Sequence, residues 1–569
     1  MVVDRKSWLQ HYDAGMPATL APYPSRTLLN YISEAAAERP THPALIFKGT
    51  RLSYGELERL SDACASALAG FGVRKGDRVA LVLPNCPQFM IAELGAWKVG
   101  AVVCPLNLLY TERELAGALA DSGAETAIVL TLFYTRIQEC QPNISLKRVV
   151  ATGIKEYLPP ALRLLFSLFK EKKEGHRVAI HPGDHWLQDL LRSGARTERS
   201  KARPSPDDPA VMLMSGGTTG TPKAVIGSHR ALVAAGLQLH AWLGPGSSDW
   251  EDIVLLPLPL FHVYACVGAQ SHAFVGHNPL ALVPNPRDIG DLLATIEKVR
   301  PTFLSGVPTL FIALLNHPKV RARKIDFSSI RICFSGAAPL LAETKKRFED
   351  LTGGRIVEGY SLTEAMMACT VNPLNGVNKL GSVGVPLPDV EVAIVDGEAG
   401  ERFLAAGDVG EVILRAPQLM TGYWRRPEET ASTLRAHGEG GPWLHTGDLG
   451  YLDADGYLFI VDRKKDLIKT SAYQVWPREV EEVIAAHPAV AEVGVAGVPD
   501  ALRGEAVKAW VVCRPGESVT EEELRRHCRA QLAPYKVPSQ IEFRTDLPKT
   551  MTGKVLRRAL AAEGHPHSS

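Results

Sequence analysis

The chain of 569 residues has almost no net charge, because 63 lysines and arginines are balanced by 62 aspartates and glutamates. A net charge of +1 creates no overall field that would hold nucleic acid, so any anionic ligand has to be bound by a local site. The sequence contains no apolar run near the ~20 residues that span a bilayer. Residues 1–15 lack the apolar core of a signal peptide. These absences predict a cytoplasmic protein that does not bind nucleic acid.

Cysteine is scattered along the chain. The nine cysteines include no C-x-x-C pair, and most of them lie in apolar segments. This distribution argues against a zinc site or a disulfide framework and predicts reduced thiols in the core. The chain is 46% hydrophobic and longer than one hydrophobic core supports, so we expect several globular subdomains.

The first two thirds of the sequence alternates between strand-like and helix-like segments. Residues 77–83 read as a buried strand and residues 88–98 as the helix that follows it. The alternation resumes after Asp207 and continues to about residue 380. This pattern predicts an α/β fold with two successive portions, separated by the polar stretch 171–209.

After Gly381 the runs become short and β-like, which predicts a distorted β portion. Residues 451–461 predict a hairpin that turns at Ala454-Asp455-Gly456. A charged segment, 462–466, then leads into a compact α+β unit.

Two helices of this unit have clear start signals, Pro477 and a capping box at Thr520 that opens a helix to about Leu532. We therefore expect a large N-terminal domain over residues 1–461 and a small α+β domain over residues 462–569.

A loop rich in glycine and hydroxyl side chains follows the apolar run 209–214. Glycines let backbone N–H groups approach an anion, hydroxyls donate to phosphate oxygens, and a lysine adds charge. The loop lacks the Gly-Lys-Ser/Thr end of a Walker A motif, and an ordinary turn is the alternative interpretation. The residues that we expect to wrap polyphosphate are Ser215, Gly216, Gly217, Thr218, Thr219, Gly220 and Lys223.

One apolar segment hints at a surface contact. Residues 157–169 are apolar and are followed by Lys170, Lys172 and Lys173. The segment suits a membrane interface or a cover over an apolar tunnel. The alternative, which we favour from the sequence, is a helix packed on the core by its Leu/Phe face.

Six further motifs follow the glycine-rich loop in order. They are LPLFHVYA (258–265), SGAAPL (335–340), VEGYSLTEA (357–365), WLHTGDLGYLD (443–453), DRKKDLIKTSAYQVWPREVEEVI (462–484) and LPKTMTGKVLRR (547–558). Together with the loop, this ordered set resembles the adenylate-forming acyl-CoA synthetase superfamily over nearly the whole chain. Within it, the motifs look most like those of long-chain fatty-acid CoA ligases.

The resemblance implies a reaction in which ATP, a fatty acid and CoA become acyl-CoA, AMP and pyrophosphate through an acyl-adenylate. The first step brings a carboxylate to an anionic α-phosphate, so positive charge has to be concentrated there. The implied cofactors are ATP, Mg²⁺ and coenzyme A. The implied partners are small molecules, and a homodimer and peripheral membrane contact stay open.

The resemblance also assigns nucleotide contacts. Ser215 to Gly220 with Lys223 correspond to the loop that holds the β- and γ-phosphates, and Glu364 with Thr219 to the magnesium ligands. The adenine-side loop corresponds to Gly336, Ala337 and Ala338, and Tyr360 would stack on the purine. Gly359 and Ser361 are further nucleotide-binding positions. Thr363 corresponds to an α-phosphate contact, and Asp448 and Arg463 to ribose contacts.

The catalytic residues implied by the resemblance include Lys554, which would bridge the acyl carboxylate and the α-phosphate. His262 would lie beside the acyl carboxylate, with a satisfied core histidine as the alternative. The small domain would rotate about Lys465 between the half-reactions, and Lys469 would then approach the adenylate. Ala472 departs from the family's usual glycine near the pantetheine, which leaves the thioester step in question.

Three rival interpretations stay open. The acid could be aryl, cinnamoyl-type or dicarboxylic; the acceptor could be a carrier-protein thiol; or the chain could be a nucleotide-binding scaffold without catalysis. The acyl tunnel is expected along residues 231–242, 262–270 and 305–309. Its small residues, such as Gly236 and Gly268, leave room for an acyl chain or serve tight helix packing.

Overall fold

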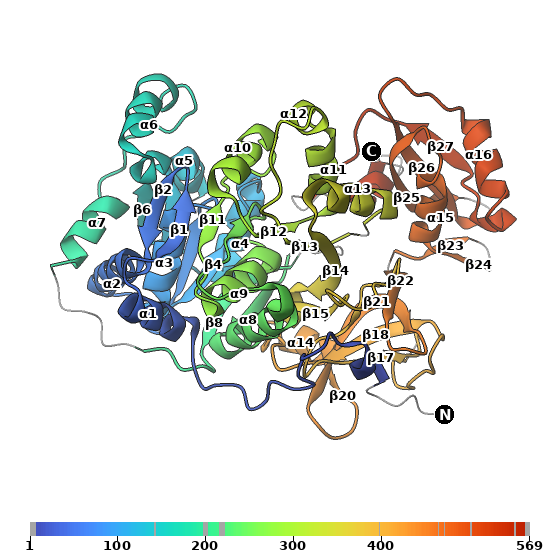
Figure 1. The fold of residues 1–569 in the computed structure, drawn as a ribbon, viewed down its shortest axis with the longest axis horizontal. Coiled ribbons are helices and arrows are strands. Elements are labelled where there is room, and N and C mark those ends of the chain that lie inside the picture. Colours follow the sequence, from blue (N-terminus) through green and yellow to red (C-terminus); the bar gives the residue numbers. More distant parts are fainter. Residues whose placement is uncertain are drawn as a thin grey trace.

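The computed structural model describes residues 7–140, 144–196, 203–215, 222–338, 340–397, 399–464, 466–470, 473–500, 503–550 and 554–563. Strands in these ranges form four β-sheets, three in a large N-terminal domain and one in a small C-terminal domain. In Figure 1 the C-terminal domain, in orange-red, lies at one end of the larger domain.

The first sheet consists of β3 (Arg78–Val82), β4 (Val102–Pro105), β5 (Thr126–Leu130), β6 (Arg148–Thr152), β7 (His185–Trp186), β8 (Pro209–Met214), β9 (Ala224–Ser228) and β19 (Gly422–Tyr423). Their order is β19-β9-β8-β4-β3-β5-β6-β7, and the strands from β8 to β7 are parallel. β5 is buried at every position. A continuous apolar run of this kind suits a parallel strand covered on both faces.

The second sheet consists of β1 (Pro43–Phe47), β2 (Thr50–Ser53), β10 (Val254–Leu256), β11 (Leu280–Leu282), β12 (Phe303–Gly306), β13 (Ile332–Ser335), β14 (Arg355–Leu362), β15 (Met367–Val371) and β16 (Val385–Pro386). The order is β16-β15-β14-β13-β12-β10-β11-β1-β2. The strands from β14 to β1 are parallel, so their carboxyl ends share one edge, and β15 turns back antiparallel to β14.

The expectation of two successive α/β portions is wrong. β1, from the N-terminal part, pairs with β11 in the second sheet, whereas β8 and β9, which follow the polar stretch 171–209, complete the first. A buried apolar run specifies a strand, but it does not specify which of two similar sheets the strand joins. The two sheets therefore exchange strands.

The third sheet contains β17 (Glu391–Val395), β18 (Gly410–Arg415), β20 (Leu434–Ala436), β21 (Pro442–Leu452) and β22 (Leu458–Arg463). All its pairings are antiparallel, and it forms the β portion that the short β-like runs predict. The predicted hairpin is confirmed between β21 and β22, where Gly456 takes a φ of 83°. A left-handed conformation at this position favours glycine.

The fourth sheet contains β23 (Ile468–Thr470), β24 (Tyr473–Val475), β25 (Val490–Asp500), β26 (Gly504–Cys513) and β27 (Gln540–Phe543). With the helices α15 (Pro477–Ala485) and α16 (Glu521–Arg529) it encloses its own core, which includes Val480, Ile484 and Leu524. The capping box at Thr520 and Glu523 is present, and the helix ends at Arg529, three residues before the predicted end.

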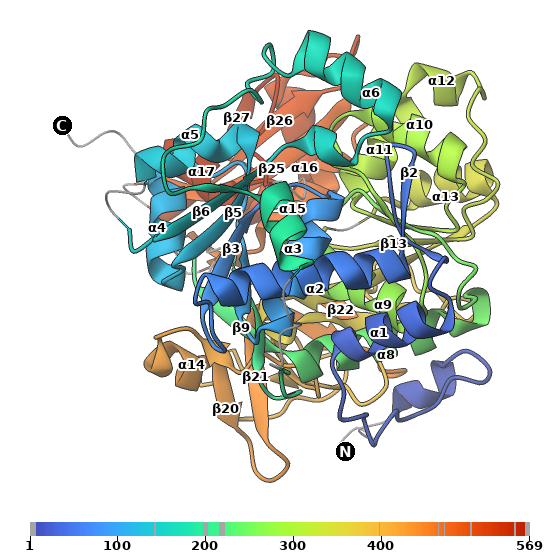
Figure 2. The ribbon, with the colours of Figure 1, turned by 90° about the vertical axis from the view of Figure 1, so that its left-hand side faces the viewer.

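Most of the remaining helices pack on and between the first two sheets (Figure 2), whereas the helix at residues 160–165 is exposed and the helix at residues 557–563 packs on β25 of the C-terminal domain. The remaining helices are α1 (Leu28–Glu38), α2 (Tyr54–Gly70), α3 (Pro87–Lys98), α4 (Glu112–Ser122), α5 (Thr131–Cys140), α6 (Pro160–Leu165), α7 (Leu187–Gly194), α8 (His229–Leu243), α9 (Gln270–Val275), α10 (Ile289–Val299), α11 (Pro308–Asn316), α12 (Pro318–Arg321), α13 (Ala342–Thr352), α14 (Pro427–Thr433) and α17 (Arg557–Glu563). Every residue of α3 is buried, so this helix is enclosed on all sides. None of the described helices is both long and apolar enough to cross a membrane.

The structure bears out several local predictions. The strand expected at 77–83 is β3, and the helix expected at 88–98 is α3. All nine cysteines are free, and eight of them are buried, as their apolar surroundings predict. By contrast, the helix expected to pack on the core within 157–169 does not do so, because its leucines face solvent. Periodicity reveals an apolar face but not the surface that covers it.

Candidate active site

A buried carboxylate lies where three strands of two sheets meet. The carboxylate of Asp448 on β21 accepts a hydrogen bond from the Tyr360 hydroxyl at 2.5 Å, and its other oxygen lies 3.0 Å from Nε of Arg463. Asp448 is only 6% exposed. Burial and the neighbouring carboxylate raise the pKa of Tyr360 well above its usual range, so the phenol remains a donor.

The backbone explains how these side chains converge. Asp448 and Arg463 are direct partners in the β21·β22 ladder, and a register shift between Leu449 and Gly450 brings them opposite each other. The pairing of β14 with β15 shifts register between Tyr360 and Ser361. A bulge of this kind re-aims side chains next to functional sites.

The predicted adenine-side loop lies beside Tyr360. A Cβ on Gly336 would come within 3.7 Å of the Gly359 carbonyl oxygen, so the loop after β13 touches the end of β14. Ala337 takes a φ of 70°, an uncommon conformation for a residue with a side chain. Ala338 follows it, partly buried. Ligands in open α/β sheets bind at this carboxyl edge of the strands.

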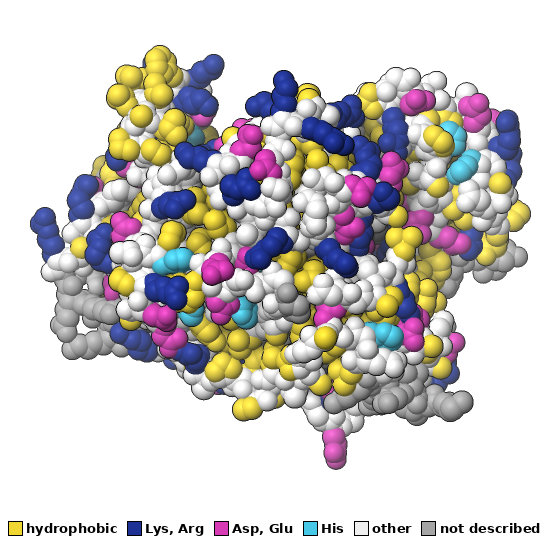
Figure 3. All heavy atoms as spheres, viewed as in Figure 1, with side chains coloured by type: hydrophobic (Ala, Val, Ile, Leu, Met, Phe, Trp, Pro, Cys, Tyr) yellow, Lys and Arg dark blue, Asp and Glu magenta, His cyan; other side chains and the backbone are white. Residues whose placement is uncertain are grey.

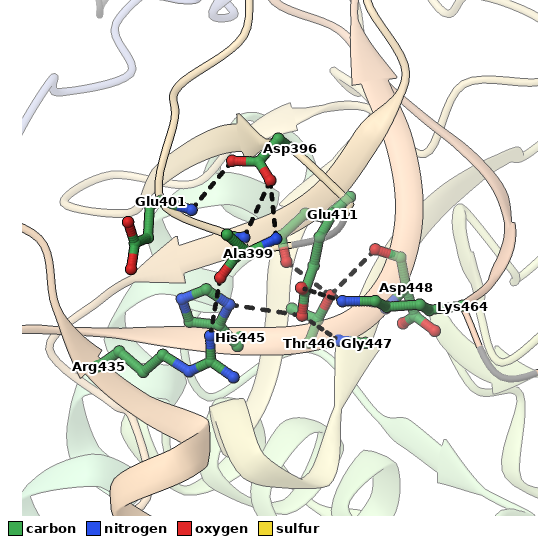
Figure 4. A network of polar contacts seen from close by, with 12 residues as sticks. Asp396, Ala399, Glu401, Glu411, Arg435, His445, Thr446, Gly447, Asp448 and Lys464 are labelled. Carbon is green, nitrogen blue, oxygen red and sulfur yellow. Dashed lines mark hydrogen bonds and ion pairs between the residues drawn. The ribbon is translucent and has the colours of Figure 1, made fainter.

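A second carboxylate supports the turn that carries Asp448 (Figure 4). The Glu411 carboxylate on β18 accepts a hydrogen bond from the Gly447 N–H at 3.1 Å and lies 3.4 Å from Nζ of Lys464. Although burial acts to raise the pKa of Glu411, its contact with His445 and the charge of Lys464 hold that pKa below its usual value. Glu411 therefore holds the turn through its contacts with Gly447, His445 and Lys464.

The predicted phosphate side contains two described anchors. The Tyr423 hydroxyl donates to the Glu364 carboxylate at 3.0 Å, and Nζ of Lys223 lies 4.8 Å from the centre of the Tyr423 ring. Lys223 also forms an ion pair with Glu429. Its backbone N–H donates to the Ser215 hydroxyl at 3.2 Å, which closes the base of the loop. The tip of the loop, Gly216 to Gly220, lies outside the described residues.

Glu364 and Thr363 lie in the one-turn segment Thr363–Ala365 directly after β14, and both are partly buried. The next two residues, Met366 and Met367, take φ values of 48° and 115°. Strained backbone of this kind persists where the surroundings over-determine it, often at functional sites. Through Tyr423, which binds the Glu364 carboxylate and lies beside Lys223, these residues are linked to the base of the phosphate loop.

His262 lies at the end of the second sheet, in front of the π-helical segment Tyr264–Ala269. Its Nδ1 accepts a hydrogen bond from the Tyr264 N–H at 3.3 Å. Burial lowers the pKa of His262 to about 4, so the ring is neutral near pH 7. Neutrality suits a gating or packing residue better than a proton donor.

The expected acyl tunnel gains one constraint. A Cβ on Gly236 of α8 would lie 2.9 Å from the backbone oxygen of Ser271 on α9. Gly236 is therefore a close helix-packing position. For this residue, that decides the choice between room for an acyl chain and tight helix packing that the sequence left open.

The C-terminal domain brings a lysine to this site. The charges of Asp448 and Arg463 both act on the ammonium group of Lys554. Its backbone N–H donates to the Thr550 hydroxyl at 3.1 Å. Lys554 is accessible to solvent, yet desolvation by the surrounding protein and the positive charge of Arg463 lower its pKa to about 8.

A cluster of charges fixes this arrangement. Arg557 binds Asp462 at 2.7 Å, Glu481 at 2.5 Å and Asp466 at 3.3 Å. Asp462 is 4% exposed and also accepts a hydrogen bond from the Arg478 N–H at 2.8 Å. The charged segment predicted as the crossing between domains is thus bound to the start of α17.

Other predicted residues stay apart from this centre. Lys469 is exposed on β23, and among the described residues no contact joins it to Asp448 or Tyr360. Lys465 and Ala472 lie outside the described residues, so the hinge and the pantetheine position stay predictions.

Sequence reasoning did not identify Arg557, Asp462, Glu411 or Tyr423 as parts of the site. Two of the four, Arg557 and Asp462, lie inside motifs singled out by the sequence. Their pairing joins residues up to 95 positions apart, which no local spacing reveals.

This arrangement defines a two-domain nucleotide-binding enzyme. It combines a buried tyrosine, aspartate and arginine with two loops at the carboxyl edge of a parallel sheet and a lysine from a second domain. Family models agree with this class. Residues 32–424 match the AMP-binding enzyme model, and residues 479–554 match the AMP-binding enzyme C-terminal domain. The chain belongs to the AMP-binding enzyme family, whose CoA ligases use ATP and CoA as substrates.

Relatives cover nearly the whole chain. A long-chain-fatty-acid–CoA ligase of Bacillus subtilis (strain 168) is 39% identical over 562 residues, 98% of each chain. A long-chain-fatty-acid–CoA ligase of Escherichia coli O157:H7 is 36% identical with the same coverage.

Among solved structures, ATP-bound MatB from Rhodopseudomonas palustris is 29% identical and matches with a TM-score of 0.79, covering 95% of this chain and 99% of that one. Apo MatB from the same organism matches with a TM-score of 0.69. The structure therefore resembles the ATP-bound form of that relative more than its apo form.

Proposed function

We propose that this protein is a long-chain fatty-acid CoA ligase. It converts ATP, a fatty acid and CoA into acyl-CoA, AMP and pyrophosphate through an acyl-adenylate. The observation that supports the proposal is the Tyr360–Asp448–Arg463 cluster, whose Asp448 and Arg463 charges act on Lys554, in a chain that is 39% identical to a long-chain-fatty-acid–CoA ligase. The full-length similarity to such ligases favours a fatty acid over the aryl, cinnamoyl-type and dicarboxylic alternatives.

The nucleotide is held by residues with distinct tasks. Asp448 is a buried acceptor that suits the two ribose hydroxyls, and Arg463 holds one of its oxygens in place. Tyr360 fixes the other oxygen and presents its ring to the purine, beside Gly336, Ala337 and Ala338. Glycines there leave the backbone close to the base. Gly359 and Ser361 flank the tyrosine, and Thr363 faces the α-phosphate.

Lys554 supplies the positive charge of the first step. A carboxylate that approaches an α-phosphate brings two anions together, so a fixed cation between them lowers the barrier. With a pKa of about 8, Lys554 is mostly protonated near pH 7. His262 lies beside the acyl carboxylate and adds no charge, because burial keeps its ring neutral.

The residues present fit magnesium. Glu364 offers hard carboxylate oxygens on the Lys223 side of the site, and Thr219 belongs to the neighbouring loop. The described residues contain no group of three His, Cys, Asp or Glu side chains that would form a closed metal site. Mg²⁺ commonly binds with one or two carboxylates and the substrate's phosphates, which neutralises phosphate charge.

The second half-reaction requires the C-terminal domain to move. Among the described residues Lys469 contacts neither Asp448 nor Tyr360, and we propose rotation about Lys465, which withdraws Lys554 and brings Lys469 to the adenylate. Rotation has to break the ion pair of Arg557 with Asp462, because Asp462 precedes the hinge whereas Arg557 and Asp466 follow it and move together. Domain boundaries at residues 461 and 462, a cytoplasmic location and a homodimer stay predictions.

The test is a chain-length series of acids from C6 to C18, assayed for AMP release with CoA and for exchange of pyrophosphate into ATP without it. We expect both activities with long saturated acids, and weaker activity with benzoate, 4-coumarate and malonate. If none of the fatty acids in the series supports pyrophosphate exchange, fatty-acid activation is contradicted. Thioester formed on an acyl carrier protein, with none on CoA, would instead identify a carrier-protein acceptor and explain Ala472.

A further inference from the structure

Residues 154–177 form an ordered lobe, here named the α6 lobe, which projects from the large domain (Figure 1). It comprises the single turn Ile154–Tyr157, α6, the π-helical turn Phe166–Lys170 and the return segment to Arg177. Figure 3 shows it as a knob of hydrophobic atoms beside basic ones. The site described above does not involve this lobe.

The base of the lobe is firmly attached. Ile154 and Tyr157 pack against the main hydrophobic core. Nζ of Lys155 lies 2.5 Å from the Glu171 carboxylate, which ties the two ends of the lobe together. The Phe166 ring meets the His176 ring at 5.3 Å, and the Glu171 N–H donates to the Phe166 carbonyl at 2.8 Å. The tip is therefore presented on a fixed support.

The tip is apolar and exposed. Five large apolar side chains within eight consecutive positions are at least 44% exposed, namely Leu162, Leu164, Leu165, Leu168 and Phe169. Leu168 and Phe169 reach 67% and 68%. Single exposed leucines are ordinary on protein surfaces, but a contiguous apolar patch marks an interaction site.

Positive charge surrounds this tip. Residues 154–177 contain six basic and three acidic side chains, a net charge of +3. Lys155, Arg163 and Lys170 have carboxylate partners within the lobe, Glu171, Glu156 and Glu174. Within the described part of the chain, no carboxylate lies at ion-pair distance from Lys172, Lys173 or Arg177. The unpaired positive charge thus follows directly after Phe169.

We propose that the α6 lobe binds the surface of an anionic lipid bilayer, with Leu168 and Phe169 inserted at the headgroup boundary and Lys172 and Lys173 on the lipid phosphates. An apolar face flanked by lysines is the pattern of interfacial helices, whose binding combines apolar burial with attraction to anionic lipid. The alternative occupant, a second copy of the lobe, would bring two patches of the same charge together. Membrane binding does not depend on which acid the enzyme activates.

The test is flotation of the full-length protein with two kinds of vesicle, phosphatidylcholine alone and phosphatidylcholine mixed with phosphatidylglycerol. We expect preferential binding to the anionic vesicles that weakens as salt is raised above about 0.15 M. Leu168→Ser with Phe169→Ser should lower the partition coefficient about tenfold or more, because it removes the inserted groups. Lys172→Glu with Lys173→Glu should abolish the preference for anionic lipid.

Matched controls lie elsewhere on the surface. Val377→Ser with Leu380→Ser removes two apolar side chains that are 58% and 69% exposed, and should leave binding unchanged. Lys319→Glu with Lys324→Glu makes the same charge change on and beside α12 and should leave the lipid preference intact. Pyrophosphate exchange with dissolved octanoate should be equal in all variants, which separates this proposal from the catalytic one.

Three results would overturn the proposal. If wild-type protein does not float with anionic vesicles, the lobe does not bind lipid. Lobe variants that bind as strongly as the controls place the contact elsewhere. A dimer in light scattering that Leu168→Ser with Phe169→Ser converts to monomer would identify a second copy as the occupant.

Discussion

The role of Lys554 makes the sharpest prediction, because its environment sets both the size and the pH dependence of the effect. Replacing Lys554 with alanine removes the cation from the point where carboxylate and α-phosphate meet. Loss of one preorganised electrostatic group in a catalytic site costs about 10²- to 10³-fold in rate. We expect that loss in pyrophosphate exchange at pH 7, with thiolysis of supplied acyl-AMP much less affected.

The pH dependence follows from the lowered pKa. Desolvation and the charge of Arg463 hold the pKa of Lys554 at about 8 in the free enzyme. The charged fraction therefore falls from about nine tenths at pH 7 to about one tenth at pH 9. Since kcat/KM reports ionisations of the free enzyme, kcat/KM for exchange should decrease about tenfold over this range.

The assay omits CoA, so ionisation of its thiol does not contribute. Lys554→Arg serves as the matched variant, because a guanidinium stays charged throughout and should remove the decrease above pH 8. A wild-type profile that is flat to pH 9, or equal losses of exchange and thiolysis in Lys554→Ala, would refute the assignment.

Three further changes test the support of the site and the fold. Arg557→Met leaves the buried Asp462 without its partner, so we expect a cost of about 3 kcal/mol in the free energy of unfolding and loss of exchange; unchanged thermal unfolding would count against the cluster. Tyr360→Phe removes a hydrogen bond to the charged Asp448 and should weaken ATP binding about tenfold by calorimetry, whereas an unchanged Kd would show that the bond contributes nothing. Burial raises the pKa of Glu93 to about 8, so the native state holds a proton that the unfolded state loses above about pH 4.5. Between about pH 4.5 and pH 8, the free energy of unfolding should therefore fall by up to about 1.4 kcal/mol per pH unit. Glu93→Gln should abolish this slope in urea titrations, and an identical slope in both proteins would contradict it.

Local features of the fold were predictable from neighbouring residues. The strand β3 and the helix α3 follow from hydrophobic periodicity, and the capping box at Thr520 follows from side chains three positions apart. The hairpin at Gly456 follows from its turn residues. Each of these patterns involves only a few neighbouring positions, so it can be recognised directly in the sequence.

The candidate site was predictable only in part. Ordered motifs indicated Asp448, Arg463 and Lys554; in the structure Arg463 pairs with Asp448, and the charges of both act on Lys554. They did not indicate Glu411, which holds the Asp448 turn through the Gly447 N–H from another strand. A supporting carboxylate has no fixed spacing from the residue that it positions.

By itself, the sequence determined the elements, the family and the order of the motifs, because these depend on residue type and short spacing. Only the tertiary structure decided that the two sheets exchange strands, that the leucines of α6 face solvent, and that Arg557 joins Asp462. The last contact spans 95 positions of the chain, and it forms because burial of Asp462 demands a partner wherever the fold can supply one.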